Sequence, residues 1–129
     1  MAQKVILLDT SILIDYYRRT NKSNSVWIKL IDEGYEFSIS AITKYELYSG
    51  AVKTQIAFWD NVLATIAIIP FDETCVDTAV AINAALKRKS KQIDLADLFI
   101  ASTAIAHNLP IATLNKKHFD RIDELILID

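Results

Sequence analysis

An apolar run with an acidic residue directly after it stands near the start of the chain. Val5 to Leu8 are four consecutive apolar residues, and Asp9, Thr10 and Ser11 follow them. Such a run is typical of a strand buried on both faces of a parallel sheet. Ligands of open α/β sheets bind beyond the carboxyl ends of the strands, so Asp9 is predicted to lie at such a position. The alternative is that these polar residues simply cap the helix that follows.

Short apolar runs alternate with helical patterns along the rest of the chain. Further strands are predicted at 35–40, 65–69 and 111–114, with a last edge strand at 125–128. Between them, apolar residues recur at helical spacing, and the helix at 95–107 is expected to bury Leu95 and Leu98. This alternation predicts an α/β fold: a three-layer α/β/α sandwich with a mainly parallel sheet of four to five strands. We expect residues 1–129 to form one domain.

Composition and charge limit the classes of function. The chain has 129 residues, of which 52% are hydrophobic, and carries a net charge of −2. An acidic chain is not expected to coat nucleic acid non-specifically, although it can contact a few phosphates. One cysteine, Cys75, excludes an internal disulfide and suits a reducing compartment. With no apolar run near the ~20 residues of a membrane span and no signal-peptide pattern, we expect a cytoplasmic protein without membrane contact.

Several oxygen-bearing side chains are predicted to meet at one edge of this sheet. Asp9 and Asn115 follow strands, Glu46 lies in the helix after the second strand, and Asp97 stands near the start of the helix before the fourth. Converging carboxylates repel one another unless a cation neutralises them. Oxygen ligands without a His or Cys cluster favour Mg²⁺ or Mn²⁺, and such a site is suited to hydrolysing a phosphodiester.

Each candidate also has an ordinary explanation. Glu46 fits an exposed helix residue, and Asn115 fits a turn. Asp94 and Asp97 fit the N-terminus of a helix, where negative charge is favourable. The remaining titratable residues are expected to have structural roles: Cys75 in the core, Asp15 in solvent, and His107 and His118 isolated and not catalytic.

Three segments, taken in order, resemble a known family. They read LLDTSILID from Leu7, ISAITKYELYSG from Ile39, and DLADLFIASTAIAHNLPIATLNKKHF from Asp94. Together they resemble a PIN domain, and more narrowly a VapC-type toxin of a type II toxin–antitoxin system. The resemblance extends from Val5 to Phe119.

The resemblance implies a Mg²⁺- or Mn²⁺-dependent endoribonuclease. Asp9, Glu46 and Asp97 match three acidic positions of the family, as catalytic residues and metal ligands. The fourth acidic position falls in a T-x-D/N turn, where Thr113 and Asn115 stand here. Asn115 departs from the all-acidic pattern, which leaves the binding of a second metal open. Further residues are implied in support: Asp94 as a compensating carboxylate, and Thr10 and Ser11 as polar residues that orient the metal shell.

Partners follow from the same resemblance. The implied substrate is RNA, with transfer RNA a frequent target in the family, and the implied partners are a VapB-like antitoxin and a second copy in a homodimer. Arg18, Arg19 and Lys22 are candidates for RNA contact, among other basic residues. Trp27 is a candidate anchor for the antitoxin, although the stripe at 26–31 fits a core equally well.

Two other functions stay open on sequence grounds. One is a PIN-like module that binds RNA or protein but has lost catalysis, which Asn115 favours mildly. The other is a phospho-receiver signalling domain, which shares the α/β pattern and the acidic residue after the first strand.

Overall fold

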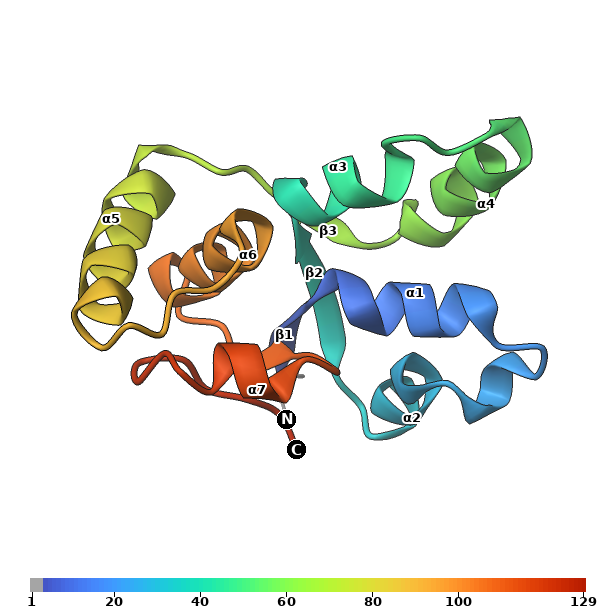
Figure 1. Ribbon diagram of the computed structural model, residues 1–129. Helices are drawn as coiled ribbons and strands as arrows, with labels where there is room; N and C mark the ends of the chain where they lie inside the picture. The colour runs from blue at the N-terminus through green and yellow to red at the C-terminus, as the bar shows by residue number, and fades with distance from the viewer. Residues whose placement is uncertain (1–3) are drawn as a thin grey trace.

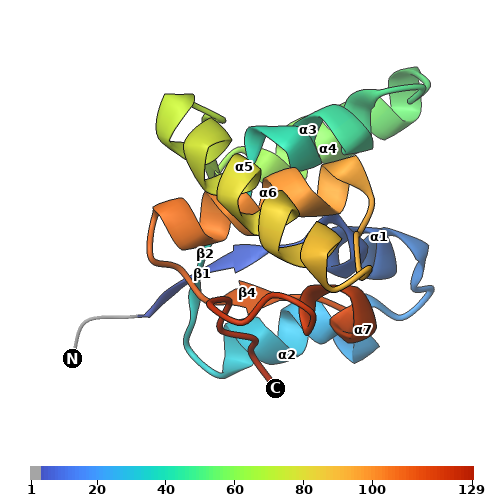
Figure 2. The same cartoon turned by 60° about the vertical axis from the view of Figure 1, so that its left-hand side comes forward.

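A parallel sheet of four strands forms the centre of the molecule (Figures 1 and 2). The computed structural model describes residues 4–129. Strand β1 (Val5–Leu8) lies between β2 (Glu36–Ser40) and β4 (Ile111–Ala112), and β3 (Ala67–Ile69) extends the sheet beyond β2. Each of these strand pairs is parallel. The predicted fold class, a three-layer α/β/α sandwich with a mainly parallel sheet, is confirmed.

Alternation of side chains along β1 supplies two cores, one on each face of the sheet. Ile6 and Leu8 belong to one cluster of buried residues and Leu7 belongs to the other, as the two-residue period of a strand requires. Residues of helices α1 (Thr10–Arg18), α2 (Val26–Asp32) and α4 (Lys53–Leu63) complete the first cluster. Residues of α5 (Glu73–Arg88), α6 (Leu95–Ala106) and α7 (Lys116–Phe119) complete the second. Figure 1 shows α5 and α6 on one side of the strands and α1 and α2 on the other.

Local signals set the ends of several helices. The Ser40 side chain caps the start of α3 (Ala41–Tyr48) by accepting a hydrogen bond from the Ile42 N–H. The Ser25 side chain caps the start of α2 in the same manner, with a backbone N–H of that helix. Gly34 and Gly50 follow α2 and α3 with φ of +91° and +79°, a conformation in which other residues are strained. A short 3₁₀ turn (Lys22–Asn24) joins α1 to α2.

The structure corrects some predicted boundaries. The edge strand expected at 125–128 is reduced to a single bridge between Ile111 and Leu127, because β4 has only two residues to pair with. Leu95, expected in the core, is 65% exposed, because it is the first residue of α6 and lies beyond the packed layer. In residues 4–129, no helix has the length and apolarity that crossing a membrane would need.

Candidate active site

Asp9 lies at the carboxyl end of the central strand and is almost completely buried. The residue is 2% exposed. The Asp9 N–H donates to the Ala112 carbonyl at 2.9 Å, which brings Asp9 next to the residues that follow β4. Oδ2 of Asp9 accepts hydrogen bonds from the Ser11 hydroxyl at 2.6 Å and the Thr113 hydroxyl at 2.8 Å. Asp9 occupies the N-cap position of α1, but its side chain caps no N–H group. Helix capping therefore does not explain this carboxylate.

Thr10 connects the start of α1 to Glu46. The Thr10 hydroxyl donates to Glu46 Oε1 at 2.6 Å, and its oxygen is also hydrogen-bonded to Thr43 Oγ1 at 3.0 Å. Thr43 and Glu46 are three residues apart in α3, so they lie on the same face of that helix. Glu46 is exposed, as its ordinary explanation requires. Its carboxylate nevertheless accepts a hydrogen bond from Thr10, the residue that follows Asp9.

Asp97 brings a further negative charge to the same edge of the sheet. It lies in the first turn of α6, and its side chain is 16% exposed. Burial raises the pKa of Asp97, and the neighbouring negative charges of Asp9 and Asp94 raise it further. Asp94 is exposed at the N-cap position of α6, where its side chain caps no N–H group. Asp97 is therefore within electrostatic range of the Asp9 and Asp94 carboxylates.

His118 is a member of this group that sequence reasoning missed. His118 Nδ1 lies 3.5 Å from Asp97 Oδ2, and this contact opposes the rise in the pKa of Asp97. The same Nδ1 atom is buried and has no hydrogen-bond partner among residues 4–129. His118 was expected to be isolated, because nothing in its spacing connects it to Asp97. One signal was available: it lies three residues after Asn115, at the same edge of the sheet.

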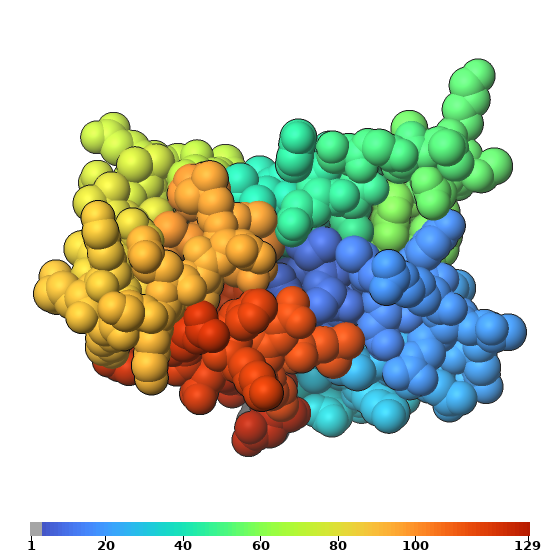
Figure 3. Space-filling view, in the orientation of Figure 1, coloured from blue at the N-terminus to red at the C-terminus, as the bar shows by residue number. Residues whose placement is uncertain are grey.

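The turn after β4 is fixed to the start of α1. The Leu114 N–H donates to the Ser11 hydroxyl at 3.0 Å, and the Asn115 N–H donates to Thr113 Oγ1 at 2.9 Å. The Asn115 side chain is exposed and caps no N–H group of α7. An open pocket of about 560 Å³ lies beside this turn, lined by Ser11, Asn115 and Arg18 among others. Figure 3 shows the dark blue start of α1 at the centre of one face, bordered by the segments of α3, α6 and α7.

The chemistry of these donors suits a hard divalent cation. Carboxylate and hydroxyl oxygens from Asp9, Glu46 and Asp97 and their neighbours are the ligands that Mg²⁺ and Mn²⁺ prefer. Within residues 4–129, the basic group at ion-pair distance from these carboxylates is His118. The three carboxylates do not bring their oxygens within 4.8 Å of one another in this part of the chain. An ion that keeps part of its water shell, as Mg²⁺ does, fits this spacing better than one held in a closed protein cage.

Comparison with known proteins identifies the family. The family model of the PIN domain matches residues 6–125.

The chain belongs to the PIN-domain family.

Individual relatives and solved structures show which members of this family the chain is similar to. Ribonuclease VapC1 of Methanocaldococcus jannaschii is 38% identical over 120 residues, which cover 92% of this chain and 82% of the relative. The crystal structure of VapBC2 from Rickettsia felis bound to a DNA fragment from its promoter matches with a TM-score of 0.83 and 30% identity, covering 96% and 97% of the two chains. A toxin–antitoxin complex from Klebsiella pneumoniae matches with a TM-score of 0.70 and 31% identity, covering 94% and 95%. The resemblance to VapC-type PIN domains is confirmed, which excludes the phospho-receiver alternative.

Asp15 of this PIN domain is not in solvent, contrary to the prediction. Asp15 Oδ2 accepts a hydrogen bond from the Val26 N–H at 3.1 Å, and Oδ1 pairs with Arg19 Nε at 3.0 Å. Val26 begins α2, so a negative charge here interacts favourably with the helix dipole. Asp15 therefore links α1 to α2 and forms an ion pair with Arg19.

Lys22 and Trp27, the candidates for contact with RNA and with the antitoxin, both make contacts within the fold. Lys22 donates hydrogen bonds to the carbonyl oxygens of Tyr16 and Tyr17 at 2.9 and 3.0 Å, so its ammonium group is occupied within the fold. Trp27 is buried in the first core and packs edge-on against Tyr16, with 4.8 Å between the ring centroids. Of the two explanations for the stripe at 26–31, the core is the correct one at Trp27.

Proposed function

We propose that this PIN domain is a Mg²⁺- or Mn²⁺-dependent endoribonuclease and the toxin of a VapBC-like toxin–antitoxin pair. The observation that carries the proposal is the buried Asp9 carboxylate, oriented by Ser11 and Thr113 and coupled electrostatically to Asp97. Similarity to a ribonuclease over 92% of the chain supports the reaction class. Similarity to a toxin–antitoxin complex supports the biological role.

Asp9, Glu46 and Asp97 would hold the metal, directly or through water. Asp94, three residues before Asp97, and Asn115, whose N–H donates to the Thr113 hydroxyl beside Asp9, are placed to contribute. When bound, a divalent ion supplies water activation and stabilisation of charge on the phosphodiester. The chain's own residues keep the ligands in place. Ser11 and Thr113 donate to one oxygen of Asp9, and Thr10 donates to one oxygen of Glu46. Each carboxylate thus keeps an oxygen for other contacts while its rotamer is fixed, as outer hydrogen bonds do in metal sites.

RNA would approach from the pocket beside the turn after β4. Arg18 lines this pocket together with Ser11 and Asn115, which belong to the acidic site. Arg19 is paired with Asp15 and Lys22 with backbone carbonyls, so Arg18 is the candidate cation for a backbone phosphate near the scissile bond. Transfer RNA is the substrate to test first, because VapC-type toxins resemble this chain and frequently cleave it.

An antitoxin segment would lie over the same side of the molecule. A second pocket of about 260 Å³ reaches Glu46 and is lined by apolar and polar residues of α1, α3 and α4, among them Tyr17, Gln55 and Trp59. A VapB-like segment seated there would cover Glu46 and hinder access of RNA to the acidic site. We further propose a homodimer, and a cytoplasmic location, where cellular RNA is available.

Cleavage by the purified, antitoxin-free protein tests the proposed function. Transfer RNA and a second structured RNA are incubated with Mn²⁺, with Mg²⁺ and with chelator, and the products are mapped to the nucleotide. We expect cleavage that requires the metal, is lost in Asp9→Asn, and is kept in Asp32→Asn, which removes an exposed carboxylate at the end of α2. Cleavage in the presence of chelator, or by a folded Asp9→Asn variant, would contradict the proposal. Metal-independent RNA binding without cleavage would instead favour the binding-only alternative.

A further inference from the structure

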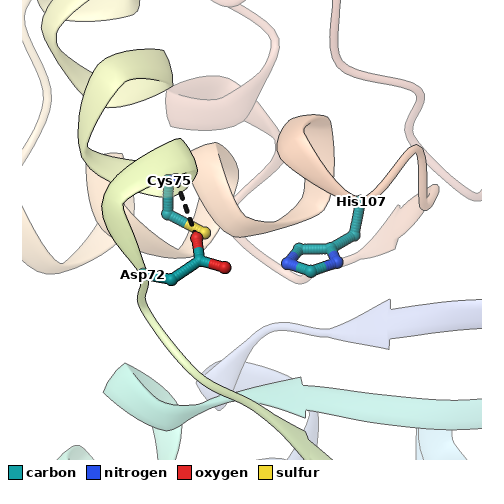
Figure 4. A group of neighbouring side chains, drawn as sticks. All are labelled: Asp72, Cys75 and His107. Carbon is teal, nitrogen blue, oxygen red and sulfur yellow. Dashed lines mark hydrogen bonds between the residues drawn. The ribbon is translucent and has the colours of Figure 1, made fainter.

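A second group of ligating side chains lies where α5 begins and α6 ends (Figure 4). Asp72 immediately precedes α5, Cys75 is in its first turn, and His107 follows the last residue of α6. One ligand atom from each of the three residues lies within 4.8 Å of the other two. The acidic site uses none of these residues.

We propose that Asp72, Cys75 and His107 form a second metal site, which takes Zn²⁺. A thiol, an imidazole and a carboxylate are the ligands that Zn²⁺ accepts together, whereas Mg²⁺ and Ca²⁺ are bound by oxygen alone. The spacing in sequence is long between Cys75 and His107, so only the folded chain assembles the set. With three protein ligands, a fourth position stays open for water.

The side chains are arranged so that each can contribute an atom. Asp72 Oδ1 accepts a hydrogen bond from the Cys75 N–H at 3.1 Å, which leaves Oδ2 available. Cys75 is fully buried, and its thiol makes a long contact, 3.9 Å, to the Pro70 carbonyl and also faces the side chains of Asp72 and Thr103. Figure 4 shows the His107 ring extending from α6 toward the Asp72 carboxylate. The ring has no hydrogen-bond partner among residues 4–129.

Zinc binding requires a small contraction of this group. Zn²⁺ lies about 2.3 Å from sulfur and about 2.0–2.1 Å from nitrogen, so its ligand atoms approach one another more closely than 4.8 Å. His107 is exposed and can rotate, whereas Asp72 and Cys75 are fixed by the helix start. The Cys75 thiol loses its proton when the metal binds, so one proton is released for each Zn²⁺ bound.

The expected consequence is a metal cross-link between α5 and α6. These helices pack on each other in the second core, and the cross-link would join the start of α5 to the end of α6. Because Zn²⁺ would bind the folded chain and not the unfolded one, it would raise the melting temperature. This inference does not depend on the proposed ribonuclease activity.

Co²⁺ is the probe for the first experiment, because a cobalt–thiolate bond gives a charge-transfer absorption band in the near ultraviolet and oxygen ligands do not. The full chain is freed of metal with chelator and titrated with Co²⁺. We expect a thiolate band that saturates at one equivalent and disappears when Zn²⁺ is added. The band should be absent in Cys75→Ser and weakened severalfold in His107→Gln. It should persist in Asp9→Asn, which separates this site from the acidic one.

Melting temperature gives a second measurement that does not rely on changing the buried cysteine. Zn²⁺ should raise the melting temperature of the wild type but not of His107→Gln, whose altered residue is exposed. Asp72→Asn should bind less tightly while keeping the helix cap, since Asn also caps. Asp77→Asn, an exposed change on α5, is the matched control and should behave as the wild type. Absence of a thiolate band in the wild type, or an undiminished Zn²⁺ response in His107→Gln, would overturn the proposal.

Discussion

The Thr113 hydroxyl donates a hydrogen bond to Asp9 Oδ2 at 2.8 Å, although the two residues are 104 positions apart in the chain. The parallel pairing of β1 with β4 creates this contact, because both strands end at the same edge. The same hydroxyl accepts the Asn115 N–H at 2.9 Å, so Thr113 fixes both the carboxylate and the turn beside it. In the proposed site, Thr113 would orient a metal ligand without touching the reacting atoms.

Replacing Thr113 tests this orienting role. Thr113→Val keeps the shape of the buried side chain but removes the hydrogen bond to Asp9. We expect RNA cleavage to fall by about 10- to 100-fold, as for other outer hydrogen bonds of metal sites, with a higher Mn²⁺ concentration needed for half-maximal rate. Thr113→Ser keeps the hydroxyl and should retain most of the activity. Equal activity of Val and Ser variants at every Mn²⁺ concentration would refute the role.

Asp97 is expected to oppose stability in the absence of metal. Its pKa is raised in the folded state by burial and by Asp9, so folding favours its protonated form. That stabilisation is present below the unfolded-state pKa and is lost as the pH rises through the folded-state pKa. At neutral pH the charged Asp97 therefore destabilises the metal-free fold relative to a neutral residue.

Asp97→Asn should consequently melt at a higher temperature than the wild type at pH 7 without metal, while losing cleavage. Each 1 kcal/mol shifts the melting temperature of a domain of this size by roughly 3–6 °C, so a difference of a few degrees is measurable. The difference should shrink toward low pH and when Mn²⁺ is added to the wild type. A lower melting temperature for Asp97→Asn at pH 7 would show that the charge is already compensated.

His118 is expected to influence the pH below which RNA cleavage falls. Its contact with Asp97 lowers the pKa of that carboxyl against the effect of burial. His118→Ala should raise the pKa of Asp97, so protons compete with the metal at higher pH and the acidic limb of the kcat/KM profile moves upward. His107→Ala, the other histidine of the chain, is the matched control and should leave the limb in place. A limb that moves equally in both variants, or in neither, would contradict this role.

Asn115 offers a gain-of-charge test. Asn115→Asp restores a carboxylate at the fourth family position, beside the pocket that Ser11 lines. We expect the Mn²⁺ concentration for half-maximal cleavage to fall severalfold, because a further negative oxygen attracts the ion. The metal-free protein should become less stable as like charges accumulate. An unchanged metal requirement would place Asn115 outside the metal shell.

The sequence predicted the parts of this molecule that depend on local pattern. The run at Val5–Leu8, the polar residues after it and the alternation of strands with helices predicted Asp9 at the carboxyl end of a buried strand. The structure confirms this and shows that the strand lies inside the sheet. The prediction that Glu46 lies in the helix after the second strand also holds, and Thr10 meets this residue there.

Contacts made by tertiary packing were not predictable in the same way. Asp15 meets the Val26 N–H only because α2 folds back on α1, and His118 meets Asp97 only because α7 packs beside α6. Leu95 matched the apolar stripe of its helix, but the end of a helix extends beyond the layer that buries its middle. Periodicity identifies a face and does not show where its burial stops.

The most direct test of the central claim is a crystal structure of the antitoxin-free protein with Mn²⁺, using anomalous scattering to locate the ion. We expect an anomalous peak between Asp9 and Asp97 that is coordinated by at least one of these carboxylates, and its loss in Asp9→Asn. A fully bound ion elsewhere, with Asp9, Glu46 and Asp97 free of metal, would contradict the account.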